Sequence, residues 1–93
     1  MRTYLVCYNI LESPNMRNKN KIFEQYLKSY SAVKLFHFIW LIKTYEPVSR
    51  IREDLISLDG INNIIIVMDV TNCDWSSQNI SESVTNWMKG KIK

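Results

Sequence analysis

The sequence predicts an α+β fold of the ferredoxin-like, split βαβ type, in which the elements follow the order β-α-β-β-α-β and a further helix follows. Three short apolar runs, at residues 4–8, 39–42 and 64–70, are typical of buried strands, and residues 32–37 supply one more strand before the second run. The stretches between them have the spacing of amphipathic helices. We therefore expect an antiparallel sheet in the strand order 4-1-3-2, with both main helices on one face and the other face bare.

The first third of the chain predicts a strand, a polar loop and a helix. Residues 3–9 are apolar on both faces, as expected for a central strand. Residues 10–20 are polar and contain Pro14, so we expect a loop there. A helix follows, because apolar residues recur along one stripe: Ile22, Phe23, Tyr26, Leu27 and Tyr30.

The middle of the chain predicts a hairpin and a second helix. Residues 32–38 alternate less cleanly, which indicates an edge strand, and a tight turn near residues 36–38 leads into a central strand at residues 39–44. Pro47 suits the first turn of the helix and Gly60 its end. The apolar stripe of this helix consists of Val48, Ile51, Leu55 and Leu58.

The last third predicts a fourth strand at residues 62–70 and a short amphipathic helix that ends at Gly90. A polar loop at residues 71–79 joins them and carries Trp75, which caps the sheet edge or joins a dimer contact. The apolar residues of the helix are Ile80, Val84, Trp87 and Met88.

The size and composition of the chain favour one small domain that pairs with a copy of itself. Residues 1–93 form a single domain, of which 46% is apolar, and a chain this short has limited stability on its own. We expect a homodimer through the bare sheet face. No apolar run is long enough to span a membrane and no signal peptide is indicated, so we expect a cytoplasmic protein. Cys7 and Cys73 fit free thiols in a reducing compartment.

The charges are distributed unevenly along the chain. Residues 1–52 carry nine basic and three acidic side chains, a net charge of +6, whereas residues 53–93 carry three basic and six acidic ones, a net charge of −3. A basic N-terminal half suits a polyanionic partner, although many ordinary domains carry a similar charge.

One rim of the expected sheet collects basic and aromatic residues. Strands one and three are expected to be parallel neighbours, so their C-terminal ends lie side by side, and the loop at residues 10–20 folds over them. Cations at such a rim would hold phosphates and a tyrosine would stack a base. The alternative is an ordinary solvated loop. The candidate nucleic-acid-binding residues are Arg17, Lys19, Lys21, Lys43 and Tyr45, beside Asn9 and Thr44.

The sequence contains no pattern that indicates an enzyme with a known cofactor. His37 has no serine or cysteine close in sequence, which favours a half-buried structural histidine or a polar residue at a tight turn. The acidic candidates for a metal site are Asp69, Asp74 and Glu12, and the predicted fold does not bring them together around Asn9. No P-loop, dinucleotide-binding or HExxH motif occurs. We therefore expect no cofactor and no metal.

Several motifs together resemble the small SinR-like proteins, which are related to the CRISPR-associated protein two family, the dimeric subunit of the spacer-integration complex. They are RTYLVCYNI, FIWLIKT, IREDLISLDGINNIIIVMDVT, NCDWSS and the later WMK, and they cover nearly the whole chain. The resemblance implies a ferredoxin-like protomer that dimerises through its sheets.

The resemblance also implies a difference in chemistry. The CRISPR-associated relatives carry an aspartate after the tyrosine of the first strand, where it is proposed to bind a metal, and this sequence has Asn9 there. A neutral amide binds Mg²⁺ less well than a carboxylate. We therefore expect a non-catalytic homodimeric module that binds nucleic acid or a protein in a phage, mobile-element or defence context. The alternative is a metal-dependent endonuclease with a displaced or degenerate site.

Overall fold

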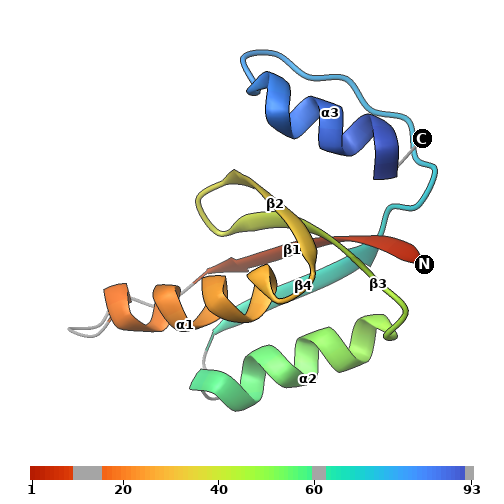
Figure 1. The fold of residues 1–93 in the computed structure, drawn as a ribbon. Coiled ribbons are helices and arrows are strands. Elements are labelled where there is room, and N and C mark those ends of the chain that lie inside the picture. Colours follow the sequence, from red (N-terminus) through yellow and green to blue (C-terminus); the bar gives the residue numbers. More distant parts are fainter. Residues whose placement is uncertain (10–15, 60–62, 92–93) are drawn as a thin grey trace.

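The computed structural model describes residues 1–9, 16–59 and 63–91, which form four strands and three helices (Figure 1). The elements follow the predicted order β-α-β-β-α-β, with a further helix after them. Their bounds are β1 Arg2–Asn9, α1 Met16–Lys28, β2 Ser31–Phe36, β3 Ile39–Thr44, α2 Val48–Asp59, β4 Ile64–Asp69 and α3 Glu82–Lys91. None of the helices in these ranges is long and apolar enough to cross a membrane.

The four strands form one antiparallel sheet in the order β2-β3-β1-β4, which is the predicted order counted from the other edge. The premise that strands one and three are parallel is wrong, because β1 pairs with β3 in the antiparallel register Arg2↔Thr44 and Cys7↔Ile39. The reason lies in the connections. The helical crossover from β1 to β2 makes these two strands run in the same direction. β3 follows β2 through a tight turn and runs back between β2 and β1, so it is antiparallel to both.

Helices α1 and α2 cover one face of the sheet (Figure 1). Every second residue of β1, including Val6, points into this layer, and the two predicted helical stripes meet it. Each fully buried side chain of this size contributes about 1.5–3 kcal/mol to folding. The fully buried large apolar side chains of this layer are Val6, Phe23, Leu27, Ile42, Ile51 and Leu55.

Helix α3 packs on the opposite face, which the sequence analysis expected to be bare (Figure 1). Met88 of α3 lies against Leu41 in the centre of the sheet, and both side chains are buried. Trp75 and Trp87 pack around them and are half-buried. Trp75 therefore joins a contact within the chain, and only part of the second face is left uncovered.

One boundary differs from the prediction in a way that affects the site: helix α1 begins at Met16, so part of the predicted loop at residues 10–20 is helical. The hairpin turns at His37 and Phe38, within the predicted tight turn near residues 36–38, and His37 is a polar residue exposed in that turn and is not half-buried. Gly60, the predicted end of the second helix, and Glu12 lie outside the described residues.

Candidate functional site

The predicted rim is divided between two ends of the molecule. Asn9 ends β1 and pairs with Ile64, whereas Lys43 pairs with Thr3 near the beginning of β1. Tyr45 follows β3 at the same end as Lys43, and 80% of its surface is exposed. Because β1 and β3 are antiparallel, their C-terminal ends lie apart. The prediction of one rim that contains both ends is therefore wrong.

The other three candidates lie at the start of α1. Lys21 is exposed, Lys19 is half-buried, and the helix backbone places Arg17 one turn before Lys21, although the side chain of Arg17 is outside what the structure describes. This turn follows β1 and therefore belongs to the end of the molecule opposite Lys43.

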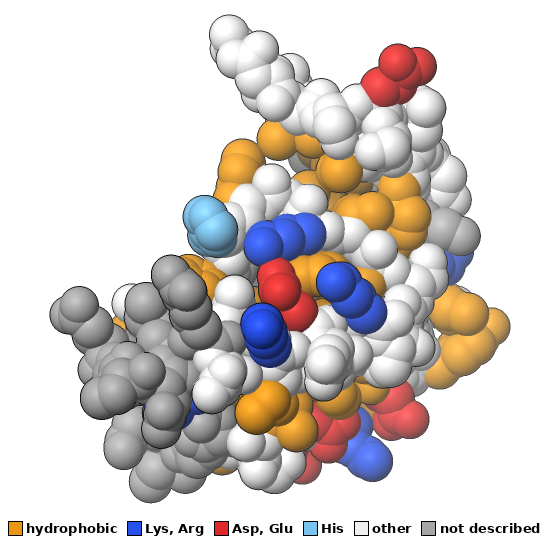
Figure 2. Space-filling model, turned by 60° about the vertical axis from the view of Figure 1, so that its left-hand side comes forward, with side chains coloured by type: hydrophobic (Ala, Val, Ile, Leu, Met, Phe, Trp, Pro, Cys, Tyr) orange, Lys and Arg blue, Asp and Glu red, His pale blue; other side chains and the backbone are white. Residues whose placement is uncertain are grey.

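A basic surface that the sequence analysis missed extends from this turn along α1. Glu24 follows Lys21 by three residues and precedes Lys28 by four, so the three side chains share one side of the helix. Lys34 reaches them from the edge strand β2, with its Nζ 2.8 Å from Oε2 of Glu24. We call the set Lys21, Glu24, Lys28 and Lys34 the lysine face. Figure 2 shows basic side chains gathered around an acidic one on this side of the molecule.

The lysine face carries a net charge of +2, because three lysines surround one glutamate. Lys21 and Lys28 are exposed and make no ion pair with any other residue that the structure describes. Glu24 is half-buried and occupied by Lys34, so it holds the β2 edge to α1 and neutralises only one of the three cations. Two ammonium groups are thus left for an external anion.

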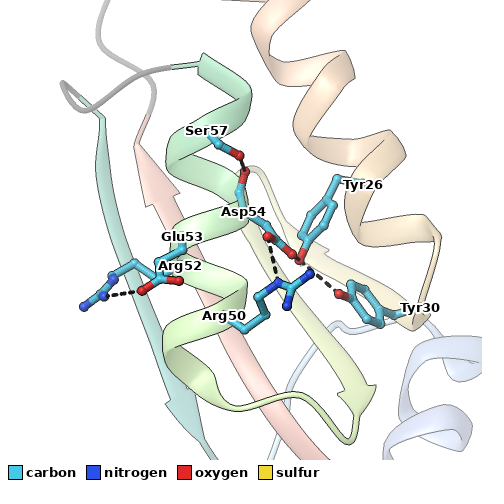
Figure 3. Close-up of polar contacts among 7 residues, drawn as sticks. All are labelled: Tyr26, Tyr30, Arg50, Arg52, Glu53, Asp54 and Ser57. Atoms are coloured by element: carbon cyan, nitrogen blue, oxygen red, sulfur yellow. Dashed lines mark hydrogen bonds and ion pairs between the residues drawn. The ribbon is translucent and has the colours of Figure 1, made fainter.

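A polar network fastens α1 to α2 (Figure 3). The hydroxyl of Tyr26 donates to Oδ2 of Asp54 at 2.7 Å, and the hydroxyls of Tyr26 and Tyr30 are 3.0 Å apart. Because the proton of Tyr26 points to Asp54, Tyr30 donates to Tyr26. Arg50 Nε donates to the other oxygen of Asp54 at 3.1 Å. Burial, followed by these hydrogen bonds, raises the pKa of Tyr26, so the network stays intact at neutral pH.

Asp69 and Asp74, the two acidic candidates that the structure describes, do not form a metal site with Asn9. Asp69 pairs with Tyr4 and so lies toward the opposite end of β1. Its carboxylate accepts bonds from Thr71 and from Arg2 Nε at 2.7 Å, and these partners lower its pKa to about 2. Asp74 is exposed in the loop that follows β4. Among the residues with described positions, no three His, Cys, Asp or Glu side chains cluster as metal ligands would.

A shallow hollow of about 260 Å³ lies where β1 ends. Its walls are mainly apolar and include Cys7, Ile39 and Ile66, with His37 and Asn9 also on the lining. Burial raises the pKa of the Cys7 thiol, which keeps it protonated and weakens it as a nucleophile. The hollow therefore offers an apolar contact surface and no evident catalytic group. Neither Cys7 nor Cys73 is part of a disulfide.

Of the described surface, the lysine face is best suited to an anionic ligand. The pattern in the sequence that indicates it is the spacing of Glu24 and Lys28, three and seven residues after Lys21. Lys34 could be assigned to it only once β2 was placed beside α1.

The chain matches no family model, no curated protein and no solved structure.

Proposed function

We propose that this protein is a non-catalytic module that binds nucleic acid through the lysine face. The observation that carries the proposal is the two exposed ammonium groups of Lys21 and Lys28, which pair with no acidic residue in the described ranges, with Lys34 fixed beside them by Glu24. Lysines on one helix side and the adjacent strand edge would follow a phosphate backbone, and each contact would release counterions.

The element order and the strand order β2-β3-β1-β4 support a ferredoxin-like assignment, which is part of this proposal. The proposal also includes kinship with the SinR-like relatives of the CRISPR-associated protein two family, and this kinship rests on the sequence motifs of the chain. The neutral Asn9 and the distant, fully engaged Asp69 support binding without cleavage over a metal-dependent endonuclease.

The lysine face is tested by removing the cations of Lys21 and Lys28. The variant Lys21→Ala/Lys28→Ala keeps the Lys34–Glu24 ion pair and loses two phosphate contacts. We expect the slope of log Kobs against log salt concentration to flatten by about 1.8 for duplex DNA and about 1.4 for single-stranded RNA. Fluorescence anisotropy with labelled oligonucleotides of both kinds, measured over a range of salt concentrations, gives the slopes.

A matched control removes the same charge elsewhere. Lys43 lies near the opposite end of β1 and Lys89 lies on α3, so Lys43→Ala/Lys89→Ala should leave the salt slope unchanged. Equal loss in both double variants would show a general effect of net charge and contradict the assigned face. Absence of binding at low salt, or cleavage of either oligonucleotide in Mg²⁺ or Mn²⁺, would contradict the proposal as a whole.

A further inference from the structure

Strand β2 is one edge of the sheet, and no other strand of the described residues lies on its outer side (Figure 1). An edge strand presents backbone N–H and C=O groups with which a further strand can pair. In an antiparallel ladder, successive residues direct these groups alternately to one side and to the other. The N–H of Tyr8 donates to the carbonyl of Phe38 at 3.0 Å, so the even-numbered residues of β3 direct their backbone groups to β1 and the odd-numbered ones to β2.

The outward backbone groups of β2 belong to Ala32 and Lys34. Leu41 is an odd-numbered residue of β3 and pairs with Val33, so Val33 bonds to β3 and its two neighbours direct their N–H and C=O groups away from the sheet. Among the residues with described positions, no backbone group bonds to this outer side. The register shift between Lys34 and Phe36 ends the regular part of the edge.

The two sides of this edge differ in chemical character. Lys34 pairs with Trp40 of the first core layer, so the side chains of Ala32 and Lys34 point to the side of α1, where the lysine face lies. On the side of α3, Leu35 and Phe36 line a hollow of about 260 Å³. Its other walls are Ser76, Ser77, Gln78, Ile80 and Met88. Figure 2 shows hydrophobic side chains directly above the gathered basic ones on this side of the molecule.

We propose that β2 binds an extended acidic segment of a partner protein, which joins the sheet as an additional antiparallel strand. The residues of this segment opposite Ala32 and Lys34 would exchange N–H···O bonds with them and direct their side chains to the lysine face, which favours carboxylates. The residues between them would point to the hollow beside Leu35, which favours apolar side chains. The recognised segment is therefore one in which carboxylates alternate with apolar residues.

Charge distinguishes this partner from a second copy of the chain. Pairing β2 with the β2 of another copy would bring together two lysine faces, each with a net charge of +2. Like charges on paired strands are destabilising, and an edge lysine is one of the devices by which proteins prevent identical edges from pairing. An acidic segment instead reduces the repulsion among the lysines. This inference goes beyond nucleic-acid binding and does not depend on it.

The experiment titrates nuclease-treated wild-type protein into fluorescently labelled peptides that are blocked at both ends, and it reads the anisotropy. The first peptide repeats glutamate-valine four times. The second has the same composition in the order Glu-Glu-Val-Val, repeated twice, so each of its faces mixes acidic and apolar side chains. We expect the alternating peptide to bind about 10-fold more tightly or better, because only this peptide satisfies both sides of the edge at once.

Methylation of the peptide backbone tests the strand pairing itself. In the proposed complex the N–H groups of the glutamates bond to β2, whereas those of the valines point to solvent. N-methylation of the glutamates should therefore weaken binding by about 10-fold or more, and N-methylation of the valines should change it by less than about 2-fold. In the protein, hydrogen exchange followed by NMR should slow at the amides of Ala32 and Lys34, and change little at Val33, when the unmethylated peptide is added.

Two charge reversals test the position of the site on the protein. Lys28→Glu should weaken binding of the alternating peptide by about 10-fold. Arg52→Glu is the control and should leave it unchanged, because Arg52 lies on α2 beside Val67 of β4, at the other edge of the sheet. No binding at about 1 mM peptide, equal affinity for both peptides, binding that survives methylation of the glutamates, or equal effects of the two reversals would each overturn the proposal. None of these results depends on whether nucleic acid binds.

Discussion

Phe38 has a backbone conformation that phenylalanine rarely adopts. Its φ of 64° lies in the left-handed region, where a side chain crowds the following carbonyl. The ring compensates by packing on Tyr8, with the two ring centroids 5.4 Å apart, and it belongs to the first core layer. The tight turn thus adopts this conformation without a glycine, and no glycine in the sequence marks where the turn lies.

Because of the strain at Phe38, we expect the usual order, in which an alanine variant is more stable than a glycine variant, to be reversed at this position. Both Phe38→Ala and Phe38→Gly lose the ring and should be destabilised. Only alanine keeps the strain, so we expect Phe38→Gly to be more stable than Phe38→Ala by about 1 kcal/mol in urea unfolding. At the exposed Tyr45, whose φ is not positive, alanine should be the more stable of the two. An alanine variant at Phe38 that is as stable as the glycine variant would contradict the strain.

A second prediction at the level of single residues concerns the stability that Asp69 contributes and its loss at low pH. Hydrogen bonds from Thr71, and then the Arg2 guanidinium, lower its pKa to about 2, below the value near 4 expected in the unfolded chain. A lowered folded-state pKa adds stability above pH 4 that disappears as pH falls toward 2. We expect Asp69→Asn to be slightly less stable than wild type at pH 6, with a difference that vanishes near pH 2. Urea unfolding at several pH values measures it, and a difference independent of pH would contradict the assignment.

Among the elements, the predicted type and order of every strand and helix are confirmed, whereas some boundaries are wrong. The stripes that include Phe23 and Leu27 in α1, and Ile51 and Leu55 in α2, were readable because a buried helix side must be apolar at regular spacing. The first turn of α1 has no apolar stripe in the sequence, and so it resembled a loop.

The pairing of α1 with α2 depends on polar atoms that the hydrophobic pattern does not report. Tyr26→Phe removes the hydroxyl that donates to Asp54 and accepts from Tyr30, and we expect the free energy of unfolding to fall by about 1–3 kcal/mol. Tyr30→Phe removes one bond of the same network and should cost about 0.5–1.5 kcal/mol. Chemical denaturation of both variants checks the order.

A double-mutant cycle distinguishes the network from a general effect of the tyrosine ring. If Tyr26 acts through Asp54, Tyr26→Phe and Asp54→Asn should not be additive, with a coupling of about 0.5–3 kcal/mol. Ser57→Ala is the control, since the Ser57 hydroxyl donates only to the backbone oxygen of Asp54 and is exposed. Additive effects of the first pair would place the stabilisation elsewhere.

Across the whole molecule, the strand order and the placement of α1 and α2 on one face of the sheet were predictable, whereas the layer formed by α3 was not and the site was only partly so. The lysines of α1 were recognised as basic, yet Lys43 and Tyr45 were grouped with them because the direction of β3 relative to β1 was taken wrongly. Strand direction follows from how the chain connects, and no local pattern in β3 encodes it. The cover of α3 on the second face was missed for a similar reason, since an amphipathic helix does not specify which apolar surface it will meet.

Three tyrosines in different parts of the core make the stability of the whole protein sensitive to alkali. Burial raises the pKa of Tyr4 and Tyr26, and it raises the pKa of Tyr8 to about 12. In the unfolded chain these phenols ionise near pH 10. Their folded-state pKa values are raised, so the stability they contribute is fully present below pH 10 and is lost as pH rises toward 12 and beyond.

We therefore expect the free energy of unfolding to decrease above pH 10, by up to about 1.4 kcal/mol per pH unit for each buried tyrosine, because the unfolded state has lost protons that the folded state keeps. Urea unfolding at successive pH values gives the slope, and absorbance near 295 nm, the phenolate band, should rise together with unfolding. Tyr8→Phe removes one of the three groups and should make the slope shallower by about that amount. Phenolate absorbance that rises fully near pH 10 in the folded protein would show that the rings are open to water.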